Sequence, residues 1–540
     1  MRLRELPEWQ KLAQCAARMS RDETHLKYLT ADAQRLNEFS LKGGGLFYDF
    51  SRQRVDKKTM EHLFDLGRAL RIDGQFRAMT QGERINVTEN RAALHTASRD
   101  FTNRPIIMDG RDVTLEIKAL GKKIKCFADD VHEKRIVGST GKPFRHIVVI
   151  GIGGSHFGTE FVAKALEMFG TPGMSIHFLS SLDSYHFEKI VSSIDPEAAL
   201  WVVISKSFKT VETLANARLA KEFMKQTVPD CDAHFVSITA AKDTENDFGP
   251  PDQSFHMFDF IGGRYSVTSA AGGVPLSLFL GHDIFQRFLK GAHDMDLHAQ
   301  NAPLDKNIPL IAALISVWNT VFLKYGALGI IPYAAPLSGL CPHIRQLHME
   351  SVGKSADIDG AMMDEPAGTV VFGEPGTNAQ HSFFQLAHQG KPFPMEFIGI
   401  IKPWHQTYSG SCHGVSNHQE LWANLIAQPI ALAQGRPNHD PARSFSGNRP
   451  SSTIIIDELS PETIGGLLSF YEAKTVYEAF LWRVNPFDQF GVESGKKTAS
   501  GIRDEIRRRN EKKEGGHLEI HRPETGAIEK FYMDMLFQGE

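Results

Sequence analysis

The sequence is poor in the features that mark secreted, redox-active and nucleic-acid-binding proteins. It has only 5 cysteines, and no two of them form the C-x-x-C pair that holds zinc or exchanges disulfides. Its 60 Lys plus Arg and 64 Asp plus Glu give a net charge of -4, which lacks the basic excess of a nucleic-acid or polybasic membrane binder. We expect reduced thiols and no nucleic-acid partner.

Long hydrophobic runs and an apolar leader are also missing. The stretch 308–318 is among the longest apolar ones, and it is well short of the roughly 20 residues that a membrane-spanning helix needs. The chain begins MRLRELPEWQKLAQ, which is charged and polar where a secretory signal has an apolar core. These absences predict a cytoplasmic protein without a membrane partner. At roughly 100–200 residues per domain, the length predicts several domains.

Short apolar runs rich in β-branched residues begin after residue 145 and alternate with helix-length stretches. The runs have the composition of strands buried on both faces. They lie at residues 146–151, 175–180, 201–205 and 234–239, with helices expected at 158–169 and 211–225. Strand alternating with helix predicts a parallel, doubly wound sheet. We place this first α/β domain at residues 111–285.

The same alternation returns in a second α/β domain, which we place at residues 286–500. Its expected strands lie at 329–334, 369–373, 396–403 and 453–457, with an apolar helix at 310–323 and a buried amphipathic helix at 463–484. The first 110 residues have helix-like charge mixing and no strong strand run, and they predict a helical N-terminal region. Residues 501–540 predict a charged helix, a Gly-Gly break and a polar arm. The fold class is therefore α/β, with helical regions at both ends.

A glycine-rich loop follows the first strand of the first domain. Residues 151–158 read GIGGSHFG and lead into a helix, a layout that directs backbone N–H groups at an anion such as phosphate. The dinucleotide fingerprint G-x-G-x-x-G fails because its sixth position is His156, which disfavours a dehydrogenase. The alternative is a tight strand-to-helix turn without a ligand.

A second polar loop, residues 205–210, ends another strand with the sequence SKSFKT. Hydroxyls and free N–H groups before a helix form a phosphate cup, whereas ordinary helix capping needs only one hydroxyl. Loops at the carboxyl ends of neighbouring parallel strands meet where open sheets bind ligands. We therefore expect the two loops to act together.

Four further side chains are candidates for chemistry. Arg264 follows two glycines, which lets its guanidinium be held close to a ligand, and Glu350 lies among apolar neighbours that favour a base. His381 begins an aromatic helix, and Lys496 lies in a GKK run that does not fit a Walker A loop. Each of them has an ordinary structural alternative. We expect no metal site: Cys412, His413 and His418 lie in a Gly/Ser-rich loop without ligand spacing.

Taken together, these segments resemble the glucose-6-phosphate isomerase (phosphoglucose isomerase) family. The runs DFIGGRYSVTSAAG and FDQFGVESGKK are similar to two long and specific family signatures. Family-like segments also occur in the expected order from about residue 40 to about residue 500. They are INVTENRAALHTASR, GIGGSHFGT, SKSFKTVET, QLHMESVGK and GEPGTNAQHSFFQLAHQG.

The resemblance implies two sugar-isomerase (SIS-type) domains, no cofactor, and a homodimer whose sites use residues of both subunits. It assigns sugar-phosphate contacts to Gly154, Ser155, Ser205, Lys206, Ser207, Thr210, Gln346 and Gln489. It implies that Glu350 moves a proton between C1 and C2 and that Arg264 faces the enediol(ate). It implies ring opening by His381 with Lys496 near the ring oxygen. Lys209 departs from the family pattern, and we expect it to point to solvent.

The expected activity is the interconversion of glucose 6-phosphate and fructose 6-phosphate, a step of glycolysis and gluconeogenesis. The residues suit it because one carboxylate can take and return a proton, while an always-charged Arg stabilises the enediol(ate) oxygen. Two alternatives stay open. One is a non-catalytic sugar-phosphate sensor, and the other is an isomerase that also accepts mannose 6-phosphate.

Overall fold

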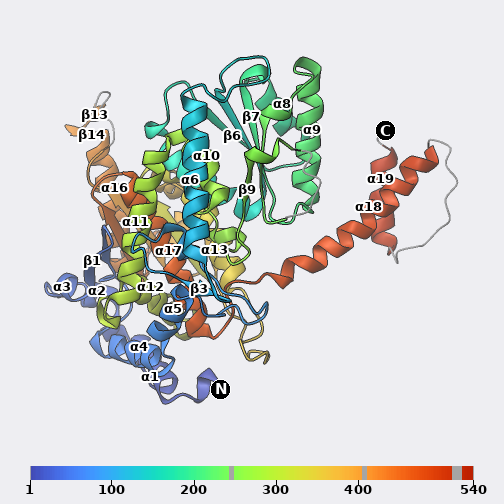
Figure 1. Ribbon diagram of the computed structural model, residues 1–540. Helices are drawn as coiled ribbons and strands as arrows, with labels where there is room; N and C mark the ends of the chain where they lie inside the picture. The colour runs from blue at the N-terminus through green and yellow to red at the C-terminus, as the bar shows by residue number, and fades with distance from the viewer. Residues whose placement is uncertain (1, 242–247, 404–409, 514–525, 539–540) are drawn as a thin grey trace. The chain divides into compact units, whose positions relative to one another are not determined.

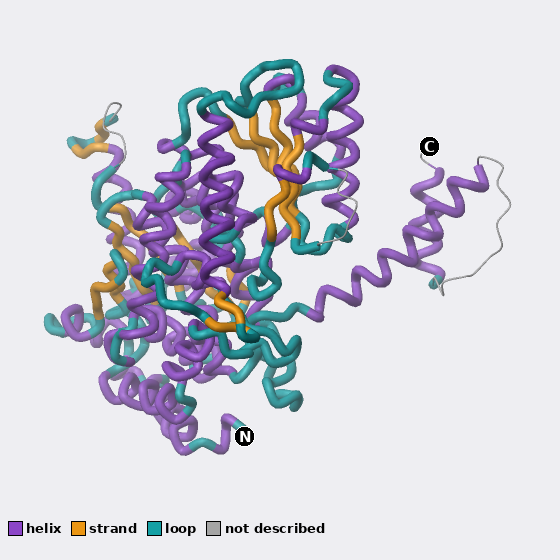
Figure 2. The backbone as a smooth tube through the Cα atoms, in the orientation of Figure 1, coloured by secondary structure: helices purple, strands orange, loops and turns teal. Residues whose placement is uncertain are grey.

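The computed structural model describes residues 2–241, 248–403, 410–513 and 526–538. The chain divides into two compact units, Met1–Phe487 and Asp488–Glu540. Figure 1 and Figure 2 show that the first unit contains two sheets, each packed against helices. This agrees with the expected α/β class and with a helical C-terminal region.

The first sheet is entirely parallel and has the strand order β6-β5-β7-β8-β9. Its strands are β5 (His146–Ile150), β6 (Ser175–Leu179), β7 (Ala199–Ile204), β8 (Phe235–Thr239) and β9 (Ser254–His256). The first four confirm the predicted runs, and all six residues of β7 are buried. The short edge strand β9 was not predicted.

Helices cover both faces of this sheet. Successive residues of a strand point to opposite faces, so each strand contributes side chains to two separate clusters. Val148 and Val203 pack with residues of α8 and α9, whereas Val149 and Val202 join the large core that includes α7 and α10. The helices are α6 (Val113–His132), α7 (Phe157–Ala165), α8 (Ser184–Val191), α9 (Val211–Thr227) and α10 (Ala270–Leu280). The doubly wound arrangement is confirmed.

The second sheet has the order β1-β2-β15-β12-β10-β11, and its last four strands are parallel. They are β15 (Ser451–Ile456), β12 (Met395–Ile400), β10 (Ala327–Pro332) and β11 (Val370–Phe372). The other two, β1 (Ser40–Gly43) and β2 (Leu46–Asp49), form a hairpin that pairs antiparallel with β15. The expectation of no strand in the N-terminal region was therefore wrong: this region completes the edge of the second sheet.

The helix α17 (Pro461–Trp482) lies at the centre of the first unit and packs against α11 (His282–Asn301), α12 (Ile308–Val317) and α13 (Leu340–Val352). Nearly every residue from Ile464 to Trp482 is buried, so this helix is enclosed on all sides and not amphipathic as expected. The predicted single helix at 310–323 is also two pieces, since α12 ends at Val317 and a π-helical turn, Trp318–Phe322, follows it.

The remaining helices lie nearer the surface. In the N-terminal region they are α1 (Pro7–Met19), α2 (Leu26–Leu29), α3 (Arg35–Glu38), α4 (Lys57–Ala69) and α5 (Ile72–Thr80). Beside the second sheet they are α14 (Gly376–Gln380), α15 (Phe384–Gln389) and α16 (Asn417–Gln434). Short two-stranded ribbons pair β3 (Ile107–Met108) with β4 (Arg111–Asp112), and β13 (Ser411–Cys412) with β14 (Val415–Ser416).

The second unit is helical. It consists of α18 (Glu493–Lys513) and α19 (Ala527–Gln538), joined by an ion pair of 2.7 Å between Arg509 and Asp534. The charged helix thus begins before the predicted residue 501, and the expected Gly-Gly break lies outside the described residues. In the described part of the chain no helix has both the length and the apolar character to cross a membrane.

Candidate active site

Two glycine loops meet at the carboxyl end of β5. A Cβ atom added to Gly154 would lie 2.2 Å from the carbonyl carbon of Gly263, so only glycine allows this approach. Gly153 has φ +61°, a conformation that glycine adopts at little cost. The Ser266 hydroxyl donates to the Gly154 carbonyl over 3.3 Å. The predicted phosphate loop is therefore fastened to the segment that carries Arg264.

The helix α13 presents Gln346 and Glu350 to these loops. The two residues are four apart and share one helical face, and Gln346 Nε2 donates to Glu350 Oε2 over 3.2 Å. A Cβ on Gly153 would lie 3.1 Å from Gln346 Nε2, which places the amide beside the loop. Gln346 Oε1 is buried without a hydrogen-bond partner in the described part of the structure. A buried acceptor without a partner can accept a hydrogen bond from a ligand hydroxyl.

Arg264 is held rigidly against the carboxylate. Its side chain is buried, and Nη1 lies 3.3 Å from Glu350 Oε2. Nε donates to Ser351 Oγ over 2.7 Å and Nη2 donates to the Pro486 carbonyl over 2.6 Å. Because these two bonds fix the guanidinium beside the carboxylate, Arg264 and Glu350 form a preorganised charge pair. Glu350 thus contacts a cation and an amide.

Tyr265 completes the support of this pair. Its hydroxyl lies 3.0 Å from Ser351 Oγ, and burial raises the pKa of Tyr265 to about 12. Ser351, Tyr265 and Pro486 were not predicted as part of the site. The sequence offered one indication of two of these residues: Tyr265 directly follows Arg264, and Ser351 directly follows Glu350.

The second polar loop lies at the carboxyl end of β7. Ser205 is buried, and its hydroxyl lies 3.5 Å from that of Thr210. Thr210 occupies the N-cap of α9 but makes no side-chain capping bond, so the capping alternative does not account for its hydroxyl. Ser207 and Lys209 are exposed, and Lys209 points to solvent as expected.

Lys206 has a different environment from the one expected of a phosphate ligand. Its ammonium donates to the carbonyls of Asp259 and Ile261, over 2.9 Å and 3.1 Å. Desolvation by burial lowers the pKa of Lys206. The side chain therefore anchors the segment that precedes Gly262 and Arg264, which links the second loop to the first.

One predicted residue of the first unit, His381, does not join this cluster. His381 is exposed at the end of α14, and in the described structure no hydrogen bond or ion pair connects it to Arg264 or Glu350. Gln489 and Lys496 are exposed residues of the second unit, where Lys496 lies in α18. The remaining predicted residue, Ser155, lies in the 3-10 turn Gly153–Ser155 of the glycine loop.

One histidine of the segment that follows residue 410 has a partner in the backbone. His418 Nε2 lies 2.9 Å from the Ile401 carbonyl, and His413 is exposed. Within the described residues, no group of three or more His, Cys, Asp or Glu side chains is arranged to hold a metal ion.

The fold and the cluster define an α/β enzyme whose site lies at the carboxyl ends of parallel strands, where a fixed cation meets a carboxylate. Residues 49–519 match the family model described as phosphoglucose isomerase. The chain belongs to the phosphoglucose isomerase family and is an isomerase.

Individual relatives agree over almost the whole chain. The chain is 53% identical over 540 residues to "Glucose-6-phosphate isomerase" of Desulfosudis oleivorans, covering 99% of this chain and 98% of the relative. It is 42% identical to "Glucose-6-phosphate isomerase, cytosolic" of Zea mays, covering 90% and 88%. A crystal structure of a glucose-6-phosphate isomerase from Chlamydia trachomatis superimposes with a TM-score of 0.88 at 31% identity, covering 100% of both chains.

Proposed function

We propose that the protein interconverts glucose 6-phosphate and fructose 6-phosphate through a cis-enediol(ate). The observation that carries the proposal is the 3.3 Å pair of Arg264 and Glu350 beside the glycine loop. The names of the relatives support the same substrate, since those from Desulfosudis oleivorans and Zea mays are glucose-6-phosphate isomerases. This reaction belongs to glycolysis and gluconeogenesis.

In this proposal Glu350 is the base. Isomerisation needs one group that removes a proton next to a carbonyl and returns it to the neighbouring carbon, and a single carboxylate can do both. The Glu350 side chain is 23% exposed, so a ligand can reach it. Gln346 holds one carboxylate oxygen and leaves the other available for the proton.

Arg264 stabilises the intermediate in the same proposal. Proton removal places negative charge on the sugar oxygens, and an Arg that is always protonated offsets this charge without giving up a proton. Its bonds to Ser351 and Pro486 fix the guanidinium before substrate arrives. Preorganised charge avoids the reorganisation that solvent would need.

The phosphate is assigned to the two polar loops at the ends of β5 and β7. Backbone N–H groups and hydroxyls there can bind an anion, and binding energy from this remote group can hold the flexible open-chain sugar in place. The proposed contacts are Gly154, Ser155, Ser205, Lys206, Ser207 and Thr210, with Gln346 beside them. Lys206 also positions the segment before Arg264, because its ammonium donates to two carbonyls of that segment.

Ring opening is assigned to His381, with Lys496 near the ring oxygen and Gln489 on the substrate side. Within the described first unit His381 does not join the Arg264 cluster, and we infer that a homodimer brings His381 of one subunit to the cluster of the other. Imidazole suits proton transfer near neutral pH. We also propose a cytoplasmic location, which the cytosolic relative of Zea mays supports.

The deciding experiment is the conversion of fructose 6-phosphate to glucose 6-phosphate by the purified chain in EDTA. We expect chelator-resistant turnover in the wild type and loss of at least about a hundredfold in kcat for Glu350→Gln, which keeps the shape and removes the base. Asp359→Asn, a carboxylate outside the cluster, is the matched control and should stay active.

Two outcomes would favour the alternatives. Binding of fructose 6-phosphate without turnover in the wild type would support a sugar-phosphate sensor. Turnover of mannose 6-phosphate at a comparable rate would show an isomerase that is tolerant at C2. An active Glu350→Gln variant would remove Glu350 from the role of base.

A further inference from the structure

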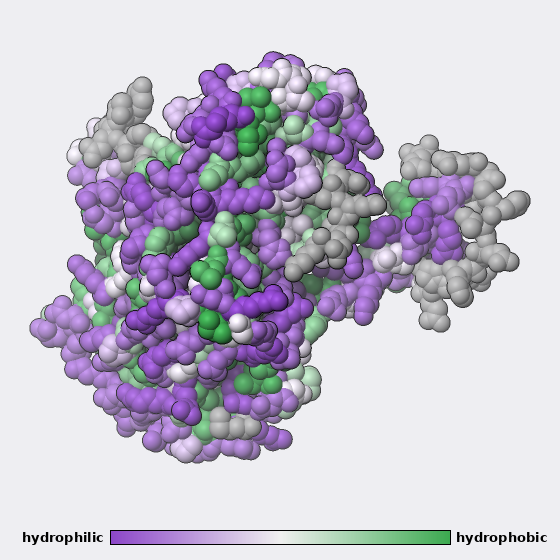
Figure 3. Space-filling view, in the orientation of Figure 1, coloured by the Kyte–Doolittle hydropathy of each residue, from purple (hydrophilic) through white to green (hydrophobic). Residues whose placement is uncertain are grey.

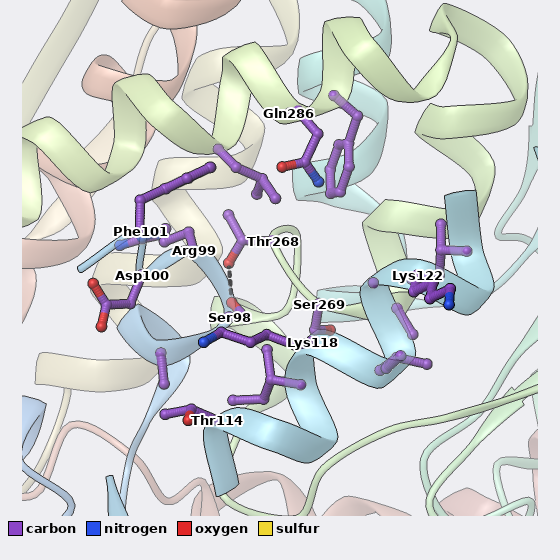
Figure 4. A pocket seen from close by; sticks show the side chains of 18 of the residues that line it. Ser98, Arg99, Asp100, Phe101, Thr114, Lys118, Lys122, Thr268, Ser269 and Gln286 are labelled. Atoms are coloured by element: carbon purple, nitrogen blue, oxygen red, sulfur yellow. Dashed lines mark hydrogen bonds between the residues drawn. The ribbon is translucent and has the colours of Figure 1, made fainter. Parts of the chain in front are cut away.

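A cavity of about 380 Å³ opens between α6, the beginning of α10 and α11. Figure 4 shows it from close by, with labelled side chains from α6, from α11 and from the residues that precede α10. None of Arg264, Gln346 and Glu350 lines this cavity. It is therefore a different site from the proposed active site, and its volume is within the range of small-molecule pockets.

The cavity has an aromatic and aliphatic lining. Phe258, Phe285 and Leu289 are buried residues that line it, and the ring of Phe258 stacks on Phe260 with centroids 4.9 Å apart. Phe101 also lines the cavity and keeps 39% of its surface exposed. Flat aromatic walls favour a ligand with an apolar, planar body. A sugar phosphate has no such body.

A few polar groups face the same space. Ser98 and Thr268 are joined by a 2.7 Å hydrogen bond, which Figure 4 draws as a dashed line beside the cavity. On the α11 side, Gln286 Nε2 lies 3.0 Å from His282 Nε2. An apolar pocket with a small number of fixed polar groups is the usual form of a binding site for a small organic molecule.

The charged residues of the lining are mostly basic. Arg104, Lys118 and Lys122 are exposed there, and in Figure 4 Lys118 extends from α6 toward Ser98. Two other cations are already compensated, since Lys125 pairs with Asp129 and Arg99 pairs with Asp296 and Glu472. The one carboxylate of the lining, Asp100, accepts two hydrogen bonds from Thr102. The excess of positive charge favours an anion.

We propose that this pocket binds a small amphipathic anion, in which an aromatic ring system carries a carboxylate, sulfonate or phosphate. The rings lie against Phe258, Phe285 and Leu289, and the anionic group faces Lys118 and Lys122. The Kyte–Doolittle surface in Figure 3 is mostly hydrophilic on this face of the first unit, with small apolar patches between. An apolar ligand body would therefore find its contacts inside the cavity.

The probe is 8-anilinonaphthalene-1-sulfonate, whose fluorescence reports transfer into an apolar site. It is titrated into the full-length protein with and without saturating fructose 6-phosphate, alongside the neutral analogue N-phenyl-1-naphthylamine. We expect one site per chain, with the sulfonate bound about threefold to fivefold more tightly than the neutral analogue, because solvent screens the exposed lysines. Equal affinity for the two probes, or displacement by fructose 6-phosphate, would overturn the proposal.

Gly121 offers a clean way to fill the cavity. It lines the pocket on α6, and a Cβ added there meets nothing within 4 Å. Gly121→Trp should weaken sulfonate binding about tenfold or more while isomerase activity stays intact, because the indole occupies the ligand's place. Gly74→Trp is the matched control, since Gly74 is an exposed helical glycine with equally open space and lies outside the pocket. Unchanged binding in Gly121→Trp would overturn the proposal.

A second variant tests the charge independently of packing. Replacing Lys118 and Lys122 together by Gln should weaken the sulfonate and leave the neutral analogue unchanged. The control replaces Lys57 and Lys58 of α4, which are exposed and outside the pocket, in the same way. If both lysine pairs have the same effect on sulfonate affinity, the attraction is general and the proposed anion site is wrong.

Discussion

Arg264 and Ser351 are joined by a hydrogen bond of 2.7 Å, in which the guanidinium Nε donates to the hydroxyl of the residue next to Glu350. The same hydroxyl lies 3.0 Å from the Tyr265 hydroxyl. One buried serine therefore connects the cation, the helix of the carboxylate and a buried phenol. This arrangement makes Ser351 a positioning residue for the Arg264–Glu350 pair.

We expect Ser351→Ala to lower kcat about tenfold with little change in KM, because the guanidinium loses its fixed direction while the phosphate loops stay intact. The free energy of unfolding should fall by about 1–3 kcal/mol, since a buried donor is left without its acceptor. Steady-state kinetics and urea unfolding measure the two effects. Tyr265→Phe is the comparison: it removes the phenol's bonds to Ser351 and Arg264 but keeps the bond between Arg264 and Ser351, so it should change kcat less. A loss of stability with an unchanged kcat would show that Ser351 supports only the fold.

The two lysines of the second polar loop should behave differently. Lys206 holds the carbonyls of Asp259 and Ile261, whereas Lys209 is exposed. We expect Lys206→Gln to raise the KM for fructose 6-phosphate by about tenfold, because a charged anchor between the two loops is lost. Lys209→Gln should change KM less than about threefold, as solvent screens an exposed charge. Equal effects of the two substitutions would contradict the anchoring role.

Much of the fold was predictable because its central strands are buried on both faces. The runs that became β5 and β7 are continuous and apolar, which sets them apart from their surroundings. Two of the strands that were missed lie at sheet edges: β1 carries Lys42 and leads into glycines, and β9 has only three residues. A third, β2, is an inner strand of only 4 residues. Edge strands are short and polar because one side has no neighbour, so their sequences give little strand signal.

The site was predictable where its residues share a local motif. Gln346 and Glu350 are one helical turn apart, and Arg264 follows the glycines that approach Gly154. Ser351 and the Pro486 carbonyl could not be predicted in the same way, because they meet Arg264 only through the packing of distant segments. The domain boundaries expected at residues 110, 285 and 500 stay predictions.

A buried carboxylate in α17 should give the fold a distinct pH dependence. Burial raises the pKa of Glu478 to about 7, and burial lowers the pKa of His348, 3.8 Å away, to about 3. Lys474 lowers the Glu478 value and Glu396 raises it, but desolvation is the largest cause. With a reference pKa of 4.5 for the unfolded chain, Glu478 contributes stability that is fully present below pH 4.5 and is lost as the pH rises to about 7.

His348 has the opposite sign, because its depressed pKa makes stability rise with pH from about 3 to its reference value of 6.5. The two contributions oppose each other between pH 4.5 and 6.5. Glu478→Gln removes only the contribution that decreases as the pH rises. We therefore expect the variant's unfolding free energy, relative to wild type, to increase by about 1 kcal/mol per pH unit across this window. Urea unfolding at several pH values measures it, with Glu222→Gln on the exposed face of α9 as control. If the difference in unfolding free energy between Glu478→Gln and wild type does not depend on pH, Glu478 does not titrate as described.

The proposed sharing of His381 between subunits can be tested by mixing two inactive variants. Glu350→Gln lacks the base and His381→Ala lacks the ring-opening group, so each homodimer should have little activity. In a mixed dimer with shared sites, the chain that keeps Glu350 receives His381 from its partner. That dimer has one complete site, and the other site lacks both groups.

If instead each site uses its own His381, no complete site exists in any mixed dimer. Unfolding and refolding equal amounts of the two variants together should therefore restore about a quarter of wild-type activity when the sites are shared, because about half of the dimers are mixed and each has one site of two. The recovery is measured as kcat per chain, with each variant refolded alone as the control. Activity no higher than that of the separate variants would place His381 in its own subunit's site, or outside the reaction altogether, and would leave the exposed position of His381 beside α14 without the explanation proposed above.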